Sequence, residues 1–288
     1  MLGTIVKGIS GFYYVAADDG SLVECKARGV FKKRGIVPLA GDKVEFSLLD
    51  GGKGVVEEIL PRRNTFDRPP VANVEVMVVV SAVPDPAPNF GVIDRFCVSG
   101  EHAGAEIVLC VNKTDLASES DLASFRKRYA GIYPVCFVSG KTGAGLEELK
   151  KLLNGRQAAL AGPSGAGKST LTNLLLGEEK SRIGDISEKL LRGKNTTRHS
   201  ELFPADGFSV FDTPGFTSFD VCDVPEEDLP ECFPEFRPFL GKCRFNDCRH
   251  LSEPGCSVAE AISAGKIDPD RAASYKEILF EIRSQKKY

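Results

Sequence analysis

The stretch GPSGAGKST, from Gly162 to Thr170, matches the pattern G-x-x-x-x-G-K-[ST] at every fixed position. In this pattern the backbone N–H groups of a glycine-rich turn face phosphate oxygens, the lysine neutralises the β- and γ-phosphates, and the next hydroxyl ligates Mg²⁺. An apolar strand is expected just before the stretch, at Gln157–Ala161, and a helix just after it, at Lys168–Leu176. The sequence therefore predicts a phosphate-binding loop in an α/β domain with a largely parallel sheet.

The whole phosphate-binding stretch is predicted to contact a nucleotide, with Lys168 as a catalytic residue and Ser169 as a ligand of Mg²⁺. A glycine-rich turn without a ligand is the competing interpretation, and the flanking strand and helix disfavour it. The predicted contacts are Gly162, Pro163, Ser164, Gly165, Ala166, Gly167, Lys168, Ser169 and Thr170.

A second motif, DTPG at Asp212–Gly215, follows the apolar run Phe208–Phe211. In D-x-x-G motifs the aspartate holds the hydration shell of Mg²⁺ and the glycine N–H senses the γ-phosphate. The intervening segment GKNTTRH, Gly193–His199, offers Thr196 or Thr197 as the second protein ligand of Mg²⁺, and we favour Thr197. Ordinary polar threonines of a loop are the competing interpretation. The residues expected to take part in catalysis are Lys168, Thr197, Asp212 and Gly215.

The stretch CVNKTDLASE, Cys110–Glu119, ends a predicted buried strand with the pattern N-K-x-D. A carboxylate at Asp115 can accept hydrogen bonds from both N1–H and the 2-amino group of guanine, whereas adenine presents no such pair of donors. The wrong base would leave this carboxylate unpaired, at a cost of roughly a few kcal/mol. Asn112 is expected to fix the loop, and the stem of Lys113 is expected to cover the purine ring. An exposed turn is the competing interpretation.

A second base loop is expected at Ser139–Lys141, after the apolar run Tyr133–Val138. Its backbone N–H groups would reach the carbonyl oxygen of guanine. Coincidence is a weak explanation for two such loops after two successive strands. The residues predicted to bind the base are Asn112, Lys113, Thr114, Asp115, Ser139, Gly140 and Lys141.

The order of these motifs is unusual, because both base loops precede the phosphate loop. Ligands bind at the carboxyl ends of the strands in parallel sheets, so all the loops can lie on one edge of one sheet. Joining the usual chain ends and opening a new break after D-x-x-G would leave such a site intact. We therefore interpret the sequence as a circularly permuted P-loop GTPase domain whose γ-phosphate sensor leads into the C-terminal region.

The N-terminal part of the chain is predicted to form short strands separated by turns, at Gly11–Ala17, Leu22–Ala27, Val44–Leu48 and Val55–Ile59. A small closed β-structure is the simplest outcome, and an oligonucleotide-binding (OB) barrel is one candidate. The basic cluster Lys26–Gly35 includes Phe31 and suits phosphate contacts beside a base-stacking ring, while a solvated loop with the aromatic ring turned inward is an equally good interpretation. The proline-containing segment Pro61–Pro70 is interpreted as a linker.

Near the C-terminus, cysteines and a histidine cluster within a short segment, at Cys243, Cys248, His250 and Cys256. Three thiolates and an imidazole form the ligand set of a closed, structural zinc site. Unlinked cysteines in a reduced cytosol are the competing interpretation. Because the region is rich in loops, we expect it to have little core of its own and to be held folded by the metal. Further cysteines are interpreted as small buried residues or surface thiols: Cys25, Cys97, Cys110, Cys136 and Cys222.

With these motifs, the chain resembles the bacterial ribosome small-subunit-dependent GTPases over essentially its whole length: a barrel, the linker RPPVANV, the permuted motif order and a zinc module. The resemblance implies an OB-fold barrel at residues 1–66, a circularly permuted GTPase domain at 71–221, and a mainly helical zinc-binding domain at 222–288. It further implies one structural zinc ion, magnesium with GTP, and GTP hydrolysis that the small ribosomal subunit stimulates during its late maturation. The implied partners are that subunit with its rRNA, and GTP or GDP.

Two positions bear on how water would be activated. Asn195 stands where that family usually has a histidine before its switch threonines, and Phe216 stands where many GTPases have a water-positioning glutamine. A phenyl ring cannot position water, so hydrolysis by the free protein is expected to be slow.

The alternative function is a zinc-stabilised RNA-binding module that uses GTP only as a structural ligand, and the magnesium ligands favour the GTPase. An ATPase is disfavoured by Asp115.

The composition is that of a folded protein, with 42% hydrophobic and 27% charged residues among 288, and the net charge of −3 excludes a polycation. The most apolar run, Val74–Val83, is too short to span a bilayer. The N-terminus also lacks the pattern of a secretory signal. A cytoplasmic monomer without a membrane partner is expected.

Overall fold

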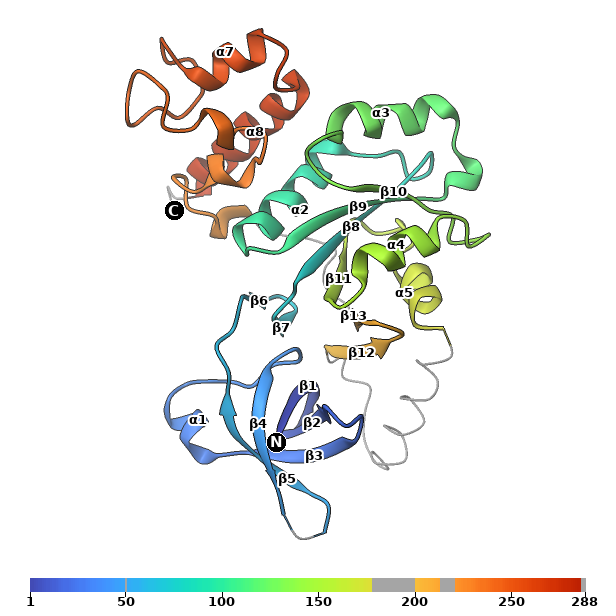
Figure 1. Ribbon diagram of the computed structural model, residues 1–288. Helices are drawn as coiled ribbons and strands as arrows, with labels where there is room; N and C mark the ends of the chain where they lie inside the picture. The colour runs from blue at the N-terminus through green and yellow to red at the C-terminus, as the bar shows by residue number, and fades with distance from the viewer. Residues whose placement is uncertain (50, 178–199, 213–220, 286–288) are drawn as a thin grey trace. The chain divides into compact units, whose positions relative to one another are not determined.

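The computed structural model describes residues 1–49, 51–177, 200–212 and 221–285 (Figure 1). The chain forms two compact units. The first unit comprises residues 1–77, 146–160 and 168–217, and the second comprises residues 78–145, 161–167 and 218–288. Each unit is therefore assembled from segments that are far apart in the sequence.

A five-stranded barrel forms the N-terminal part of the first unit. Its strands are β1 (Leu2–Ile9), β2 (Phe12–Ala17), β3 (Leu22–Ala27), β4 (Lys43–Leu48) and β5 (Gly54–Ile59). They are neighbours in the order β1-β2-β3-β5-β4, and β1 also pairs with β4, which closes the barrel. Alternate residues such as Ile5, Val15 and Val44 are fully buried inside it. The predicted OB-type barrel is confirmed, with β1 as a strand that the sequence analysis did not identify.

The basic cluster of the barrel contains the short helix α1 (Gly29–Lys33). Phe31 packs into the barrel core, while Lys32 and Lys33 are exposed. A ring buried in the core cannot stack on a nucleic-acid base. Of the two interpretations of this cluster, the structure therefore supports the solvated segment with its aromatic ring turned inward.

The segment predicted to be a linker contains an antiparallel hairpin, formed by β6 (Thr65–Asp67) and β7 (Pro70–Ala72). Backbone and side-chain hydrogen bonds attach it to the barrel, from Ala72 N–H to the Ala40 carbonyl and from Asn73 Nδ2 to the Gly41 carbonyl, both at 2.9 Å. Gly41 has φ +93°, and a Cβ there would lie 2.0 Å from the Ala72 carbonyl oxygen. The linker prediction was incomplete, because these tertiary hydrogen bonds give the segment a fixed structure.

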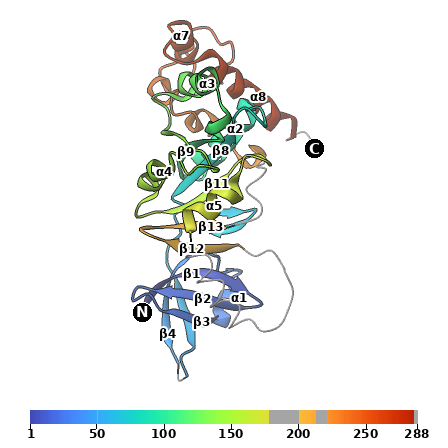
Figure 2. The same cartoon turned by 90° about the vertical axis from the view of Figure 1, so that its right-hand side faces the viewer.

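Three further strands extend the sheet beyond β1 of the barrel, in the order β11-β13-β12-β1. They are β11 (Gln157–Ala161), β12 (Glu201–Ala205) and β13 (Phe208–Asp212), and only Ala161 of β11 belongs to the second unit. Strands β11 and β13 are parallel, whereas β12 pairs antiparallel with β13 and with β1 (Figure 2). At the junction with the barrel, Lys7 forms an ion pair with Glu201 at 2.7 Å. The helix α5 (Lys168–Leu176) matches its predicted range, and α4 (Leu146–Leu153) also lies in the first unit.

The second unit contains β8 (Val76–Ala82), whose first two residues belong to the first unit, with β9 (Glu106–Asn112) and β10 (Val135–Phe137) in the order β10-β9-β8. All seven residues of β8 are buried, as expected of a strand covered on both faces. The helices are α2 (Phe90–His102) and α3 (Glu119–Tyr129), and a 3₁₀ turn lies at Thr114–Leu116.

The C-terminal region of the second unit is mainly helical. It contains α7 (Ser257–Ser263), α8 (Pro269–Gln285) and short 3₁₀ helices at Val221–Asp223, Leu229–Cys232 and Arg237–Phe239. Phe233, Phe236, Tyr275 and Ile278 lie in a buried cluster that also includes Val98 of α2. The expectation of little core was therefore wrong, because aromatic residues of the loop-rich segment pack against α8.

A buried network of charges joins α2 and α3 to the C-terminal region. Asp94 of α2 accepts hydrogen bonds from Arg128 of α3 at 2.7 Å and from Arg271 of α8 at 2.5 Å, and Arg271 also pairs with Glu235. Burial alone would raise the pKa of Asp94, but Arg271 and Arg128 lower it below its ordinary value. Breaking a buried pair of this kind is costly, so the network fixes α8 on α2.

Among the described helices, none combines the length and the apolar character that a membrane span requires.

Candidate functional site: a nucleotide site and a cysteine–histidine cluster

Asn112, at the end of β9, makes hydrogen bonds that join three loops of the second unit. Its Nδ2 donates to the Ala166 carbonyl at 2.9 Å, while its Oδ1 accepts from the N–H groups of Lys113 at 2.8 Å and Gly140 at 2.9 Å. The side chain is buried, with 2% exposure. The two predicted base loops and the phosphate-loop residues 162–167 therefore lie together, although the chain presents them in reversed order.

Asp115 is exposed and has a defined orientation, because its Oδ1 accepts a hydrogen bond from Ser139 Oγ at 2.6 Å. Ser139 Oγ in turn accepts from the Thr142 N–H at 3.1 Å. Ser139 thus orients the carboxylate that we predicted to read the base. The Gly140 N–H, predicted to face guanine, donates to Asn112 instead, so in this structure it supports the loop.

Lys113 has a left-handed backbone with φ +65°, and its Nζ donates to the Asp85 carbonyl at 2.6 Å. The next residue, Pro86, lies near the phosphate loop, because a Cβ added to Gly165 would lie 3.7 Å from Pro86 Cδ. The segment between β8 and α2 therefore binds the base loop through Lys113 and lies beside the phosphate loop. The sequence analysis missed this segment because it acts through a main-chain oxygen and has no motif.

Two glycines of the phosphate loop are required by close contacts. Gly162 has φ +140°, and a Cβ there would lie 2.1 Å from the Val80 carbonyl oxygen. Gly167 has φ +92°, and its Cβ would lie 2.2 Å from Asn112 Nδ2. Both positions need glycine for conformation and for space, because a side chain would meet the Val80 carbonyl or the Asn112 amide.

Lys168 and Ser169 follow this loop directly in the chain and begin α5 in the first unit. Burial lowers the pKa of the Lys168 ammonium below its ordinary value. Asp212 ends β13, which runs parallel to β11 with Phe211 opposite Ala159. Asp212 therefore leaves the sheet at the same edge as the end of β11, which continues into the phosphate loop.

Several predicted site residues lie outside the described residues. They are Thr197 and Gly215, together with the other positions considered for the switches, Asn195, Thr196, His199 and Phe216.

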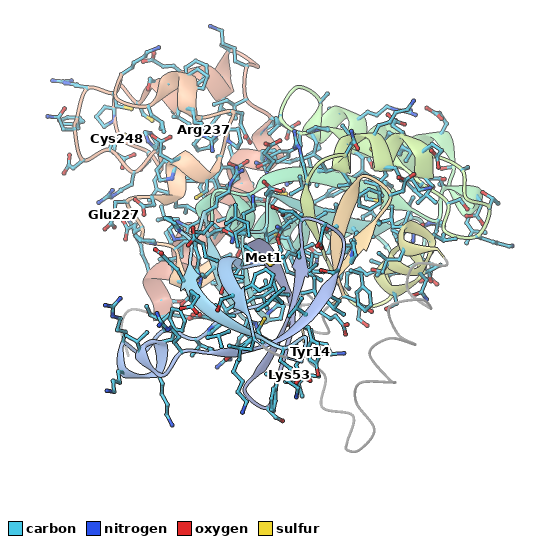
Figure 3. All side chains as sticks on the ribbon, turned by 60° about the horizontal axis from the view of Figure 1, so that its bottom comes forward. Met1, Tyr14, Lys53, Glu227, Arg237 and Cys248 are labelled. Carbon is cyan, nitrogen blue, oxygen red and sulfur yellow. The ribbon has the colours of Figure 1, made fainter. Side chains whose placement is uncertain are left out.

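A second candidate site is formed by Cys243, Cys248, His250 and Cys256, whose potential ligand atoms all lie within 4.8 Å of one another; Figure 3 labels Cys248. The three sulfur atoms lie 3.6, 3.7 and 3.4 Å from His250 Nδ1. Tetrahedral zinc with Zn–S of about 2.3 Å and Zn–N of about 2.0 Å separates sulfur from nitrogen by about 3.6 Å. The sulfur-to-nitrogen distances therefore fit a zinc ion bound by these four residues.

The loop of this cluster is organised by Glu253, which the sequence analysis also missed. Its carboxylate accepts hydrogen bonds from the N–H groups of Arg249 at 2.9 Å, Leu251 at 2.8 Å and Ser252 at 3.0 Å. Burial would raise its pKa, but the backbone donors lower it to about 2. These bonds fix the backbone on both sides of His250, which has φ +59°.

Cys25, Cys97, Cys110 and Cys136 are buried, the first of the two alternatives that the sequence left open for them, and Cys232 is buried as well. The side chain of Cys222 is not among those described.

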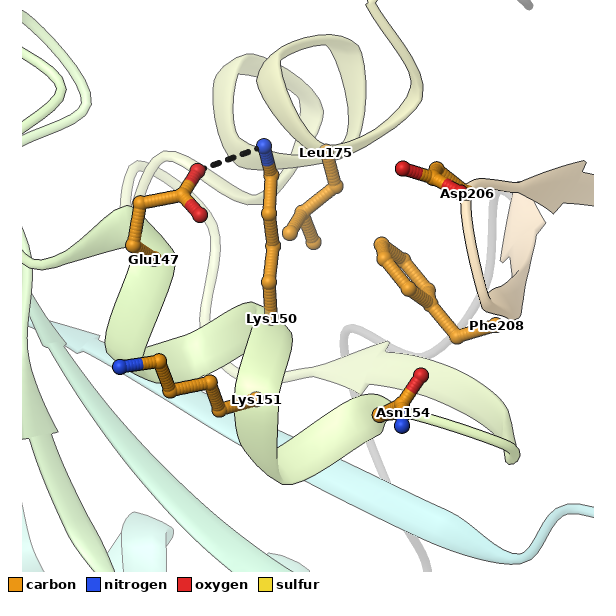
Figure 4. A pocket seen from close by; sticks show the side chains of 7 residues that line it. All are labelled: Glu147, Lys150, Lys151, Asn154, Leu175, Asp206 and Phe208. Atoms are coloured by element: carbon orange, nitrogen blue, oxygen red, sulfur yellow. Dashed lines mark hydrogen bonds and ion pairs between the residues drawn. The ribbon is translucent and has the colours of Figure 1, made fainter.

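A separate pocket of about 310 Å³ lies in the first unit between α4, the end of α5 and the β12–β13 hairpin (Figure 4). Lys150, Asp206 and Phe208 are among its lining residues, and Lys150 is paired with Glu147 at 2.8 Å. The pocket lies before the amino ends of β11 and β13, opposite the edge that carries the nucleotide motifs. It is therefore distinct from the candidate nucleotide site.

Comparison with known proteins gives consistent results. The family described as RsgA GTPase matches residues 59–222, and the RsgA N-terminal domain matches residues 2–56. A small ribosomal subunit biogenesis GTPase RsgA of Agathobacter rectalis is 45% identical, with 100% of each chain covered, and the protein of that name from Clostridium beijerinckii is 44% identical over 100% of this chain and 99% of its own.

Two solved structures are similar over nearly the whole chain. The crystal structure of YjeQ from Thermotoga maritima has a TM-score of 0.86 and 35% identity, covering 98% of each chain. The structure of YloQ, described as a circularly permuted GTPase, has a TM-score of 0.85 and 32% identity, covering 99% of this chain and 95% of its own.

Proposed function

Because the chain belongs to the RsgA GTPase family, we propose that this GTPase binds the small ribosomal subunit, assists its late maturation, and hydrolyses GTP faster when bound to it. The observation that carries the proposal is the hydrogen bonding of Asn112, which joins both base loops to the phosphate loop. Relatives that match the full length of the chain are named for biogenesis of that subunit. The rRNA is the partner we propose on the subunit, with the protein acting as a cytoplasmic monomer.

In this proposal, guanine binds to Asp115, oriented by Ser139, with the stem of Lys113 over the purine ring. The phosphates lie on the N–H groups of Gly162–Gly167 and on the Lys168 ammonium. Mg²⁺, held by Ser169 and Thr197, would neutralise phosphate charge. Asp212 would orient the hydration shell of the ion, and the Gly215 N–H would respond to the γ-phosphate. The remaining proposed nucleotide contacts are Asn112, Thr114, Gly140, Lys141 and Thr170.

We also propose three domains along the chain: a barrel at residues 1–66, a permuted GTPase domain at 71–221 and a zinc-binding domain at 222–288. The pairing of β12 with β1 supports a link between the switch-bearing part of the GTPase domain and the barrel, since β12 begins just after residues 178–199. Hydrolysis of GTP would release the switch segments that contain Thr197 and Gly215, and would weaken the binding of the protein to RNA.

The test is release of phosphate from GTP by the full-length protein, with and without purified small ribosomal subunits. We expect slow release by the free protein, given Phe216, and at least about tenfold faster release with the subunits, since completing a preorganised site typically gives 10²–10³-fold. Large subunits serve as the control and should give no stimulation.

Equal rates with and without small subunits would favour the alternative function, a zinc-stabilised RNA-binding module in which GTP is a structural ligand. That alternative also predicts that RNA affinity is the same with GTP and with GDP.

For the cysteine–histidine cluster we propose one structural zinc ion. Because Cys248 is one of four ligands, Cys248→Ser should lower the zinc content from about one ion per chain to near zero. Trypsin should then cut between Cys243 and Cys256 faster than in the native protein. The buried core of Phe233 and Tyr275 should protect α8, so we expect local rather than complete digestion.

Cys232→Ser is the matched control, because Cys232 is buried in the same region but lies outside the cluster. It should keep its zinc. Full zinc content in the Cys248→Ser protein would contradict the assignment.

A further inference from the structure

The segment Pro84–Asn89 joins the nucleotide site to the first turn of α2. At one end, the Asp85 carbonyl accepts a hydrogen bond from Lys113 Nζ, and Pro86 lies near Gly165 of the phosphate loop. At the other end, Asn89 caps α2 by accepting from the Val92 N–H at 3.1 Å. Prolines at 84, 86 and 88 restrict φ, so this short segment is stiff. A displacement at the start of α2 would therefore move the Asp85 carbonyl that Lys113 binds, next to Asn112, which donates to Ala166 of the phosphate loop.

Arg95 ties that first turn of α2 to α8. Its Nη1 donates to the Gly91 carbonyl at 2.9 Å, while Nε and Nη2 donate to Glu281 Oε2 of α8 at 2.9 and 2.7 Å. The two side chains are partly exposed, at 27% and 34%. Arg95 can therefore be replaced without opening the core, and the neighbouring buried pair of Asp94 with Arg271 would keep the helices together.

A similar ion pair lies at the other end of α2. Arg237 of the C-terminal region, labelled in Figure 3, donates to Glu101 at 2.6 Å. This pair too joins α2 to the C-terminal region. Its α2 residue, Glu101, lies one position before the last residue of the helix, His102, and is far along the helix from Pro84–Asn89. This pair provides a matched control for the position of an ion pair along α2.

We propose that Arg95 is a positioning residue for guanine-nucleotide binding. Through Gly91 and the segment Pro84–Asn89 it holds Lys113 and the phosphate loop in place. The packing of α8 against α2 then determines the rate at which the nucleotide dissociates. The inference rests on the proposed function for its ligand. It gives the C-terminal region a second connection to the nucleotide, besides the direct continuation of the chain after Asp212. A partner that moves α8 would accelerate nucleotide release.

The experiment measures the dissociation rate of a fluorescent GDP analogue from the full-length, zinc-loaded protein. Arg95→Ala should accelerate release at least about fivefold, the lower end of typical couplings between sites. Glu281→Ala, which removes the oxygen that accepts both hydrogen bonds from Arg95, should accelerate it similarly. Arg237→Ala should change the rate less than about twofold, within the usual effect of a surface pair. The exchanged pair, Arg95→Glu with Glu281→Arg, should recover most of the native rate.

Equal rates for the native and Glu281→Ala proteins would overturn the inference, and so would equal acceleration by Arg237→Ala and Arg95→Ala. Circular dichroism and the midpoint of thermal unfolding show whether each variant is folded. If the native protein fails to bind the GDP analogue at all, the proposed function fails instead, so the two failures are distinguishable.

Discussion

Replacing Lys168 with alanine should abolish measurable GTP turnover, with a loss of about 10²–10³-fold or more in the subunit-stimulated rate. The phosphate loop offers backbone dipoles, and Lys168 begins the helix that follows it with a full positive charge. Burial lowers the pKa of this ammonium, which means that its charge is poorly solvated in the free protein. A bound triphosphate would bring negative charge beside this ammonium, and the interaction should strengthen as negative charge shifts during hydrolysis.

The check is phosphate release at saturating GTP, together with nucleotide affinity measured by fluorescence. Lys151→Ala is the control, because Lys151 is an exposed lysine of α4 at the separate pocket. It should have native turnover. A Lys168→Ala protein that retains half of the native rate would show that another group supplies the charge.

Asp115→Asn should lower the affinity for GTP by about a hundredfold, because the wrong group facing two guanine donors costs a few kcal/mol. The amide still accepts from Ser139 but offers an N–H where guanine also presents one. Xanthine has a carbonyl oxygen in place of the 2-amino group, so xanthosine triphosphate should bind the variant better than GTP does. The variant is therefore expected to exchange one base preference for another, which loss of folding could not produce.

Competition between GTP, ATP and xanthosine triphosphate for a fluorescent guanine nucleotide measures this preference. Asp206→Asn, at an exposed aspartate of the β12–β13 hairpin, is the control and should bind as the native protein does. Unchanged guanine preference in the Asp115→Asn protein would remove the base-reading role from this carboxylate.

The fold was predictable where the pattern is local. The buried strand before Asn112 and the strand and helix that flank the phosphate-binding loop were identified from their apolar patterns, and they are β9, β11 and α5. Strands β1 and β12 were missed although each pairs with the next strand along the chain, β1 with β2 and β12 with β13. Strand β1 contains Gly3 and Gly8, and β12 contains Pro204, residue types that are depleted in strands. The hairpin of β6 and β7 was missed because hydrogen bonds to the barrel loop at Ala40 and Gly41 fix it.

The candidate site was predictable where side chains carry the chemistry. The motif residues Asn112 and Asp115 could be read directly, and the structure brings them to the loops expected. Asp85 could not be predicted, because its main-chain oxygen contacts Lys113 and any residue type has one. Glu253 could not be predicted either. Its carboxylate accepts hydrogen bonds from backbone N–H groups that come together only after the loop around His250 has folded.

The central claim is that one GTP molecule is held at its base by Asp115 and at its phosphates by the loop that ends at Lys168, although the chain presents these elements in reversed order. The most direct measurement is a crystal structure of the full-length protein with Mg²⁺ and a non-hydrolysable GTP analogue. We predict N1 and the 2-amino group of guanine within hydrogen-bond distance of the Asp115 carboxylate, and the β- and γ-phosphates on the N–H groups of the phosphate loop and Lys168 Nζ. A nucleotide that contacts only one of these two elements would contradict the account.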